Sequence, residues 1–135
     1  MIYVDAAALV KLVRSEPESD AFAAWLASRR DVPLVSSALV EVEVTRALRR
    51  TAPQALVGVG AVLARVARSE ITAAVRARAA AYPDGVLRSL DAIHLATAEI
   101  VGERPGMELE AFVTYDVRLA EAAEALGLPA VSPGS

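Results

Sequence analysis

Three aspartates follow or begin regular elements predicted from this sequence, where they could act together. Asp5 directly follows the apolar run Ile2–Val4, and Asp116 follows Phe112–Thr114 with one residue between them. Asp91 lies in the first turn of a predicted helix, surrounded by apolar residues. Each one alone could be a helix-start residue that interacts favourably with the helix dipole. A carboxylate in apolar surroundings, however, needs a cationic partner or a proton, and a divalent cation would satisfy Asp91.

A predicted helix over Ser37–Arg50 supplies two further candidates, Glu41 and Glu43. At about 100° per residue the two glutamates fall on opposite shoulders of the apolar face of this helix. Only one of them can therefore point into a site beside that face, and helical geometry alone does not choose between them. The apolar face consists of Val40, Val44, Ala47 and Leu48.

One glutamate and three aspartates in one place would form a site for hard cations. Two unit charges about 5 Å apart repel by about 3 kcal/mol at an effective dielectric constant of about 20, so such a cluster does not form for stability. Oxygen-only ligands suit Mg²⁺ or Mn²⁺, which keep several waters and bind few carboxylates together with substrate phosphates. This donor set is typical of phosphodiester hydrolysis by metal-activated water.

The elements that must position these residues alternate along the chain. Short apolar strands separated by helices predict an α/β fold, with a parallel sheet covered by helices on both faces. Ligands in such folds bind beyond the carboxyl ends of the strands, where the aspartates stand. The expected strands are Ile2–Val4, Pro33–Val35, Glu70–Ile71 and Phe112–Thr114. The expected helices are Ala6–Val13, Glu18–Arg29, one capped by Ser36 or Ser37 that runs to about Arg50, Pro53–Arg68, Ala73–Ala81, Ser89–Val101, and one from Asp116 to about Gly127.

Composition indicates one soluble domain. The chain has 135 residues, of which 55% are hydrophobic. This apolar content is enough to form a core and excludes disorder that results from too few apolar residues. It has no cysteine, which excludes disulfides and thiolate metal sites. We find no apolar run of about 18 residues and no signal peptide, and we expect a cytoplasmic protein that makes no membrane contact. We expect a single domain over residues 1–135 with a frayed tail at 132–135.

Four segments together resemble the PIN-domain ribonucleases, in particular the VapC-type toxins of type II toxin–antitoxin systems. They occur in the family order and cover nearly the whole chain. The third segment, Leu90–Ala98, is the one most specific to this family. The segments are Ile2–Leu12, Ser37–Leu48, Leu90–Ala98 and Phe112–Pro129.

The resemblance implies a three-layer α/β/α fold with a parallel sheet of about four to five short strands. It implies an Mg²⁺- or Mn²⁺-dependent endoribonuclease, a homodimer that cleaves RNA and is inhibited by a VapB-like antitoxin. Carried over to this sequence, it gives Asp5, Glu43, Asp91 and Asp116 as acidic metal ligands and catalytic residues, and thereby selects Glu43 over Glu41. Thr114 matches the supporting hydroxyl position beside the last aspartate.

One departure from the family concerns the residues after Asp5. Family members usually have Ser or Thr one or two positions later, whereas here Ala6, Ala7 and Ala8 follow. That support is either missing or supplied by Thr114 or water, and the loss of such an outer contact typically costs about 10- to 100-fold in metal affinity or activity. The alternative function is a non-hydrolysing PIN-fold protein that binds RNA or a partner.

Other residues near these segments have more ordinary interpretations. His94 is the only histidine, and we expect it to be buried and hydrogen-bonded in a structural role. Arg46 and Arg50 flank Glu43 on its helix and could contact RNA or a partner, or could simply form a solvated helix end.

Two other protein classes share this architecture and an acidic pocket. A receiver domain needs a lysine after its final strand, but the only lysine is Lys11 in the first helix. A phosphatase of the haloacid dehalogenase type needs Asp-x-Asp after its first strand, and Ala7 occupies the second position. The sequence therefore fits neither class.

Overall fold

A five-stranded parallel sheet organises the protein, whose computed structural model describes all residues from Met1 to Ser135. Its order is β3-β2-β1-β4-β5, and all four strand pairings are parallel. This confirms the α/β class and the expected number of strands. The strands are β1 (Ile2–Val4), β2 (Leu34–Ser37), β3 (Val66–Ser69), β4 (Ala111–Val113) and β5 (Ala130–Val131).

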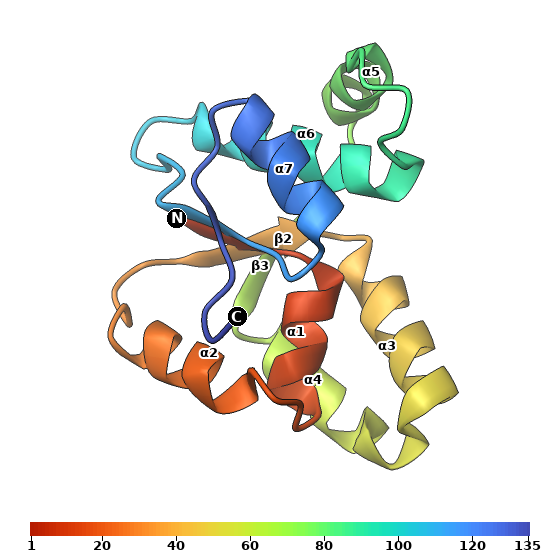
Figure 1. Ribbon diagram of the computed structural model, residues 1–135, viewed down its shortest axis with the longest axis vertical. Helices are drawn as coiled ribbons and strands as arrows, with labels where there is room; N and C mark the ends of the chain where they lie inside the picture. Colours follow the sequence, from red (N-terminus) through yellow and green to blue (C-terminus); the bar gives the residue numbers. More distant parts are fainter.

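Helices cover both faces of this sheet, as the connections between parallel strands require. In Figure 1, one group of helices lies below the sheet and a second group lies above it. The lower group contains α1 (Ala6–Val13), α2 (Ser19–Ala27), α3 (Val40–Thr51) and α4 (Val59–Leu63). The upper group contains α5 (Ala73–Ala81), α6 (Ser89–Gly102) and α7 (Val117–Ala125). The three-layer arrangement is therefore as predicted.

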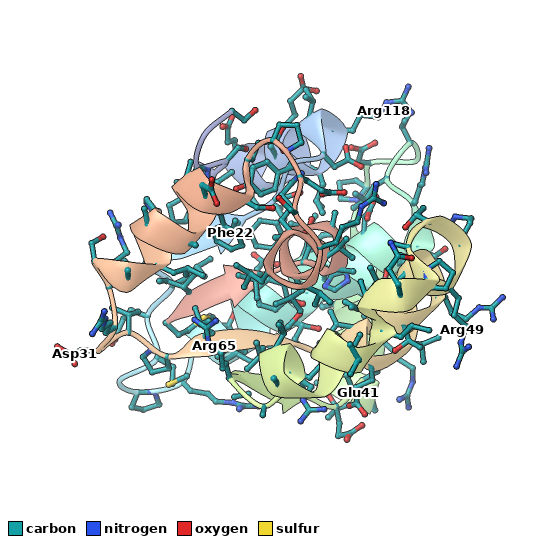
Figure 2. The ribbon with its side chains drawn as sticks, turned by 90° about the horizontal axis from the view of Figure 1, so that it is seen from below. Phe22, Asp31, Glu41, Arg49, Arg65 and Arg118 are labelled. Atoms are coloured by element: carbon teal, nitrogen blue, oxygen red, sulfur yellow. The ribbon has the colours of Figure 1, made fainter.

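The alternation of side chains along β1 divides the core into two parts. Ile2 and Val4 face the lower helices, where they pack with Phe22 of α2. Figure 2 shows Phe22 pointing from α2 into the molecule. Tyr3 points to the other face and stacks on Phe112 of β4, with ring centroids 5.2 Å apart. Successive strand residues face opposite sides of a sheet, so the single residue Tyr3 is directed towards α6 and α7.

The prediction was wrong between residues 53 and 71. Pro53–Arg68 is not one helix: a 3₁₀ helix, η1 (Pro53–Gly58), leads into the short α4, and β3 follows at Val66–Ser69. Glu70–Ile71 therefore lies after the strand that we expected it to form. Register explains the difference, because Val66 pairs with Leu34 and Ser69 pairs with Ser37 at the edge of the sheet. A tertiary pairing thus overrides the local helical pattern.

Two helix starts also differ from the prediction. Ser36 and Ser37 belong to β2, and α3 begins at Val40 without a side-chain cap. The Ser37 hydroxyl accepts from the Leu39 N–H in the turn before this helix, at 3.1 Å. Ser89 is likewise the first residue of α6 instead of its cap.

The segment after β5, which we expected to fray, is held by specific contacts. The Ser132 hydroxyl donates to the Thr114 carbonyl at 2.6 Å, and the Tyr115 hydroxyl donates to the Pro133 carbonyl at 2.8 Å. Figure 1 shows the chain ending beside α2. None of the helices has the length and apolar character needed to span a membrane.

The strand order places a topological switch point at the centre of the sheet. The chain leaves β1 towards β2 and β3 on one side, and later adds β4 and β5 on the other. Connections on the two sides of such a point diverge, which opens a crevice at the carboxyl ends of the two strands. Asp5 follows β1, and Thr114 and Asp116 follow β4, so all three stand at this crevice.

Candidate active site

The four carboxylates carried over by family resemblance line one cleft, although they come from four different elements. Asp5 follows β1, Glu43 belongs to α3, Asp91 to α6, and Asp116 precedes α7. All four line a cleft of about 540 Å³ at the carboxyl ends of the strands. A hollow of about 570 Å³ lies near the amino ends of β2 and β3, but only one carboxylate lines it. We therefore place the candidate site in the former cleft.

Asp5 is the buried end of this cleft, with 5% of its surface exposed. Its Oδ1 accepts from the Ala8 N–H at 2.9 Å, so Asp5 also caps α1. Burial raises the pKa of the Asp5 carboxyl, and a hydrogen bond from the Thr114 hydroxyl partly offsets this rise. The residue that follows the neighbouring strand β4 thus supplies a hydroxyl that the three alanines after Asp5 do not have.

Asp116 lies on the exposed side of the cleft and caps α7. Its Oδ1 accepts from the backbone N–H groups of Arg118 and Leu119 at 2.9 and 3.3 Å. The Thr114 hydroxyl oxygen accepts from the Asp116 N–H at 3.1 Å, which fixes the turn between β4 and α7. Thr114 therefore binds the backbone of Asp116 and lowers the pKa of the Asp5 carboxyl.

Asp91 differs from the other aspartates because it has no partner within the protein. It lies in the first turn of α6 and forms neither a side-chain hydrogen bond nor a salt bridge, and Arg88 caps the helix start without a side-chain contact. Burial, followed by the negative charge of Asp116, raises the pKa of the Asp91 carboxyl. A partly buried carboxylate with an acidic neighbour and no bound donor is electrostatically unfavourable unless a cation joins it.

The structure separates the two glutamates of α3. Glu43 lines the cleft, whereas Glu41 is exposed and lies 3.7 Å from the Arg68 guanidinium of β3. In Figure 2, Glu41 is found at the rim of the molecule. Glu43 Oε1 lies 2.7 Å from Nε2 of His94, and His94 Nδ1 lies 2.7 Å from the Tyr3 hydroxyl oxygen.

His94 is buried and hydrogen-bonded, as the sequence predicted, but its contact with Glu43 was missed. Periodicity places His94 on the inner face of α6, and no pattern in the sequence says which side chain of another helix it meets. The fact that it is the only histidine is the one signal that could have drawn attention to it.

Arginines surround the acidic residues of the cleft. Arg46, Arg50 and Arg88 line it, and none of the three forms a salt bridge or side-chain hydrogen bond with the protein. Their guanidinium groups are therefore free to bind phosphate oxygens. Lys11 instead binds Glu16 and Glu18 at 3.0 and 2.8 Å, which leaves no lysine at the site and agrees with the exclusion of a receiver domain.

The donor set fits Mg²⁺ or Mn²⁺, although the side chains do not form a closed cage. No group of three or more acidic or histidine side chains is close enough together to hold an ion on its own. Mg²⁺ commonly binds through one or two carboxylates and keeps several waters, so it does not need such a cage. The unpartnered carboxylate of Asp91 and the buried carboxylate of Asp5 provide hard oxygen donors for this kind of binding.

Comparison with known proteins identifies the class to which this fold and cleft belong. Residues 2–125 match the PIN-domain family, and this region includes all four carboxylates. The chain therefore belongs to the PIN-domain family.

Relatives within this family are more specific. Ribonuclease VapC35 of Mycobacterium tuberculosis is 56% identical over 134 residues, which cover 99% of this chain and 98% of the relative. Ribonuclease VapC46 of the same species is 41% identical over 132 residues, which cover 98% of this chain and 97% of the relative. Within the PIN-domain family, the chain is thus a VapC-type ribonuclease.

Solved structures share the fold over nearly the whole chain. The crystal structure of M. tuberculosis VapC20, a toxin that cleaves the sarcin–ricin loop, aligns with a TM-score of 0.74 at 20% identity. It covers 98% of this chain and 100% of VapC20. The structure of VapBC2 from Rickettsia felis, bound to a DNA fragment from its promoter, aligns with a TM-score of 0.66 at 15% identity, covering 98% and 99% of the two chains.

Proposed function

We propose that this protein is the toxin of a type II toxin–antitoxin pair and acts as a metal-dependent endoribonuclease. Asp5, Glu43, Asp91 and Asp116 hold Mg²⁺ or Mn²⁺ in the cleft at the carboxyl ends of β1 and β4. A divalent ion held by these carboxylates would supply an activated water and would offset the charge that develops as an RNA phosphodiester bond breaks. The family membership and the identity of 56% to a VapC ribonuclease support this activity.

The observation that carries the site assignment is the unpartnered carboxylate of Asp91. The Asp5 and Asp116 carboxylates already accept hydrogen bonds as helix caps, so their positions do not by themselves indicate a bound cation. Asp91 accepts no such hydrogen bond, and burial together with the charge of Asp116 opposes its ionisation. A divalent cation bound near Asp91 would remove that electrostatic penalty.

The protein groups around the ion have separate roles. Asp5 and Asp91 provide the buried side of the binding site, and Asp116 provides the side open to solvent. Thr114 supports Asp5 with its hydroxyl. Arg46 and Arg50 bind the phosphates that flank the scissile bond, because they line the same cleft without partners in the protein.

The partner is a VapB-like antitoxin, and the protein forms a homodimer that acts on RNA in the cytoplasm. The VapBC2 structure from R. felis, whose fold matches this chain, supports an antitoxin of that kind. Sedimentation of the purified chain should give twice the monomer mass of 14.1 kDa. Sedimentation at the monomer mass itself would refute the dimer without affecting the nuclease assignment.

Cleavage of total cellular RNA by the purified protein with Mn²⁺ tests the function. Asp91→Asn should abolish both cleavage and growth inhibition, because it removes the charge that has no other partner, while circular dichroism shows an unchanged fold. EDTA should abolish cleavage by the unaltered protein. Full activity of Asp91→Asn would reject this site. Measurable Mn²⁺ binding without any cleavage would instead support the non-hydrolysing alternative.

A further inference from the structure

A chain of hydrogen-bonding groups runs from the core of the protein to the acidic cleft. The Tyr3 hydroxyl oxygen lies 2.7 Å from His94 Nδ1, and His94 Nε2 lies 2.7 Å from Glu43 Oε1. Tyr3 has no exposed surface and His94 has 2%, whereas Glu43 reaches the cleft. Tyr3 does not line the cleft, and His94 lines it with only 2% of its surface exposed, so the side-chain contact that links both residues to the acidic site is the one between His94 and Glu43.

The chemistry of the three groups sets the direction of both hydrogen bonds when the imidazole is neutral. An ionised Glu43 carboxylate can only accept, so His94 Nε2 must carry the hydrogen that it receives. A neutral imidazole has one N–H group, which leaves Nδ1 as an acceptor. A tyrosine hydroxyl keeps its proton at neutral pH and can donate to this Nδ1. With a neutral imidazole and an ionised carboxylate, the three residues therefore satisfy one another in one arrangement.

We propose that His94 is a positioning residue for Glu43, and that the hydroxyl of Tyr3 fixes the imidazole tautomer that allows it to act. The bond from Nε2–H holds Oε1 of Glu43 and leaves the other carboxylate oxygen available to the cation. A glutamate on a helix surface otherwise loses rotamer entropy when it binds an ion, and prior positioning reduces that loss. This inference rests on the proposed function only in its assignment of Glu43 to the metal.

The tautomer can be tested without metal, substrate or catalysis. His94 is the only histidine, so ring ¹⁵N resonances in an NMR spectrum of the chain in EDTA report this residue alone. We expect a protonated Nε2 and an unprotonated Nδ1 at pH 8. Tyr3→Phe, which keeps the ring stacked on Phe112, should lower the population with this tautomer. A hydrogen on Nδ1 in the unaltered protein, or an unchanged spectrum in Tyr3→Phe, would overturn the inference.

The positioning effect can be measured as Mn²⁺ affinity of the RNA-free protein, followed by the electron paramagnetic resonance of the free ion. His94→Leu should weaken binding about 10- to 100-fold, the usual cost of losing an outer contact of a metal ligand. His94→Gln should restore much of the affinity, because its amide both donates and accepts. Tyr3→Phe should cost about 3- to 10-fold, comparable to one hydrogen bond. Equal losses in His94→Gln and His94→Leu would indicate packing alone and overturn the inference.

Two controls separate this inference from the proposed function. Tyr82→Phe removes a hydroxyl that binds Glu99 on α6, outside the cleft, and should leave Mn²⁺ affinity unchanged. In a Glu43→Gln background, Tyr3→Phe should cause no further loss of affinity, and a further loss would show that Tyr3 acts by another route. If the unaltered protein binds no Mn²⁺ while the expected tautomer is observed, the metal assignment fails and the hydrogen-bonded chain remains.

Discussion

Individual residues of the cleft make structural contacts in addition to the functional role proposed for them. Asp5 caps α1 through the Ala8 N–H and also faces the other carboxylates. A buried charge of this kind destabilises the protein unless it is compensated, so the site is built at a cost to stability. Asp91 carries the same electrostatic penalty without any capping role in return.

Asp5→Asn should therefore stabilise the metal-free protein while removing activity. Burial raises the folded pKa of Asp5 above its usual 3.8, so ionisation of this group makes unfolding easier as the pH rises through that range. Asparagine stays neutral and can still accept from the Ala8 N–H. Thermal melts in EDTA should show Asp5→Asn a few degrees above the unaltered protein at pH 7.5, on the order of 1 kcal/mol.

The pH dependence provides the check on this explanation. The difference between the two proteins should shrink towards pH 4, where Asp5 takes up a proton and both side chains are neutral. The exposed Asp31, which points outward at the opposite end of the molecule in Figure 2, gives the matched control Asp31→Asn. A destabilised Asp5→Asn at pH 7.5 would contradict this account.

Helices and strands differ in how well the sequence predicts them. The prediction gave β1, α1 and α5 with the observed bounds, because each is short and has clear boundaries at Asp5, Thr72 or Tyr82. It failed at β3, whose position depends on pairing with β2 at the sheet edge. Local pattern contains no information about that register.

The same limit applies to the candidate site. The aspartates could be predicted because their places at strand ends and in a helix start follow from element order alone. The choice of Glu43 over Glu41 could not be made from helix geometry, and it needed the family resemblance. The contact of His94 with Glu43 depends on the spacing of α3 and α6 across the cleft, which only the folded structure shows.

At the level of the helix, Asp116 allows the capping and metal-binding roles to be separated. Asparagine caps helices about as well as aspartate, whereas alanine costs about 1 kcal/mol at such a position. Asp116→Asn should retain the melting temperature and lose most nuclease activity, because the carboxylate charge is gone. Asp116→Ala should lose most nuclease activity and should also melt at a lower temperature. If Asp116→Asn cleaved RNA at the normal rate, Asp116 would be a cap of α7 and nothing more.

The whole molecule carries a net charge of −3. An acidic protein does not attract RNA through its overall charge, so binding must depend on local groups. Arg46 and Arg50 on α3 border the acidic cleft and are not neutralised by protein carboxylates. Figure 2 shows Arg49 of the same helix extending into solvent, away from the body of the protein.

Salt dependence should reveal which arginines contact phosphates. In an Asp91→Asn background, which prevents cleavage, Arg46→Ala and Arg50→Ala should each weaken binding to single-stranded RNA. Each should also reduce the slope of log affinity against log salt by about 0.7, the value for one phosphate contact. Arg104→Ala, an exposed arginine after α6, is the matched control and should change neither quantity. Unchanged slopes in Arg46→Ala and Arg50→Ala would assign these residues to a solvated helix end.

The placement of β4 has a consequence for the synthesis of the protein. The central strand β1 is made before its partner β4 and the adjoining Asp116, which follow only after the helices α1 to α6. The cleft therefore lacks one wall and one carboxylate until β4 and Asp116 have been made. A nascent chain that ends before β4 therefore has an incomplete cleft and lacks the Asp116 carboxylate.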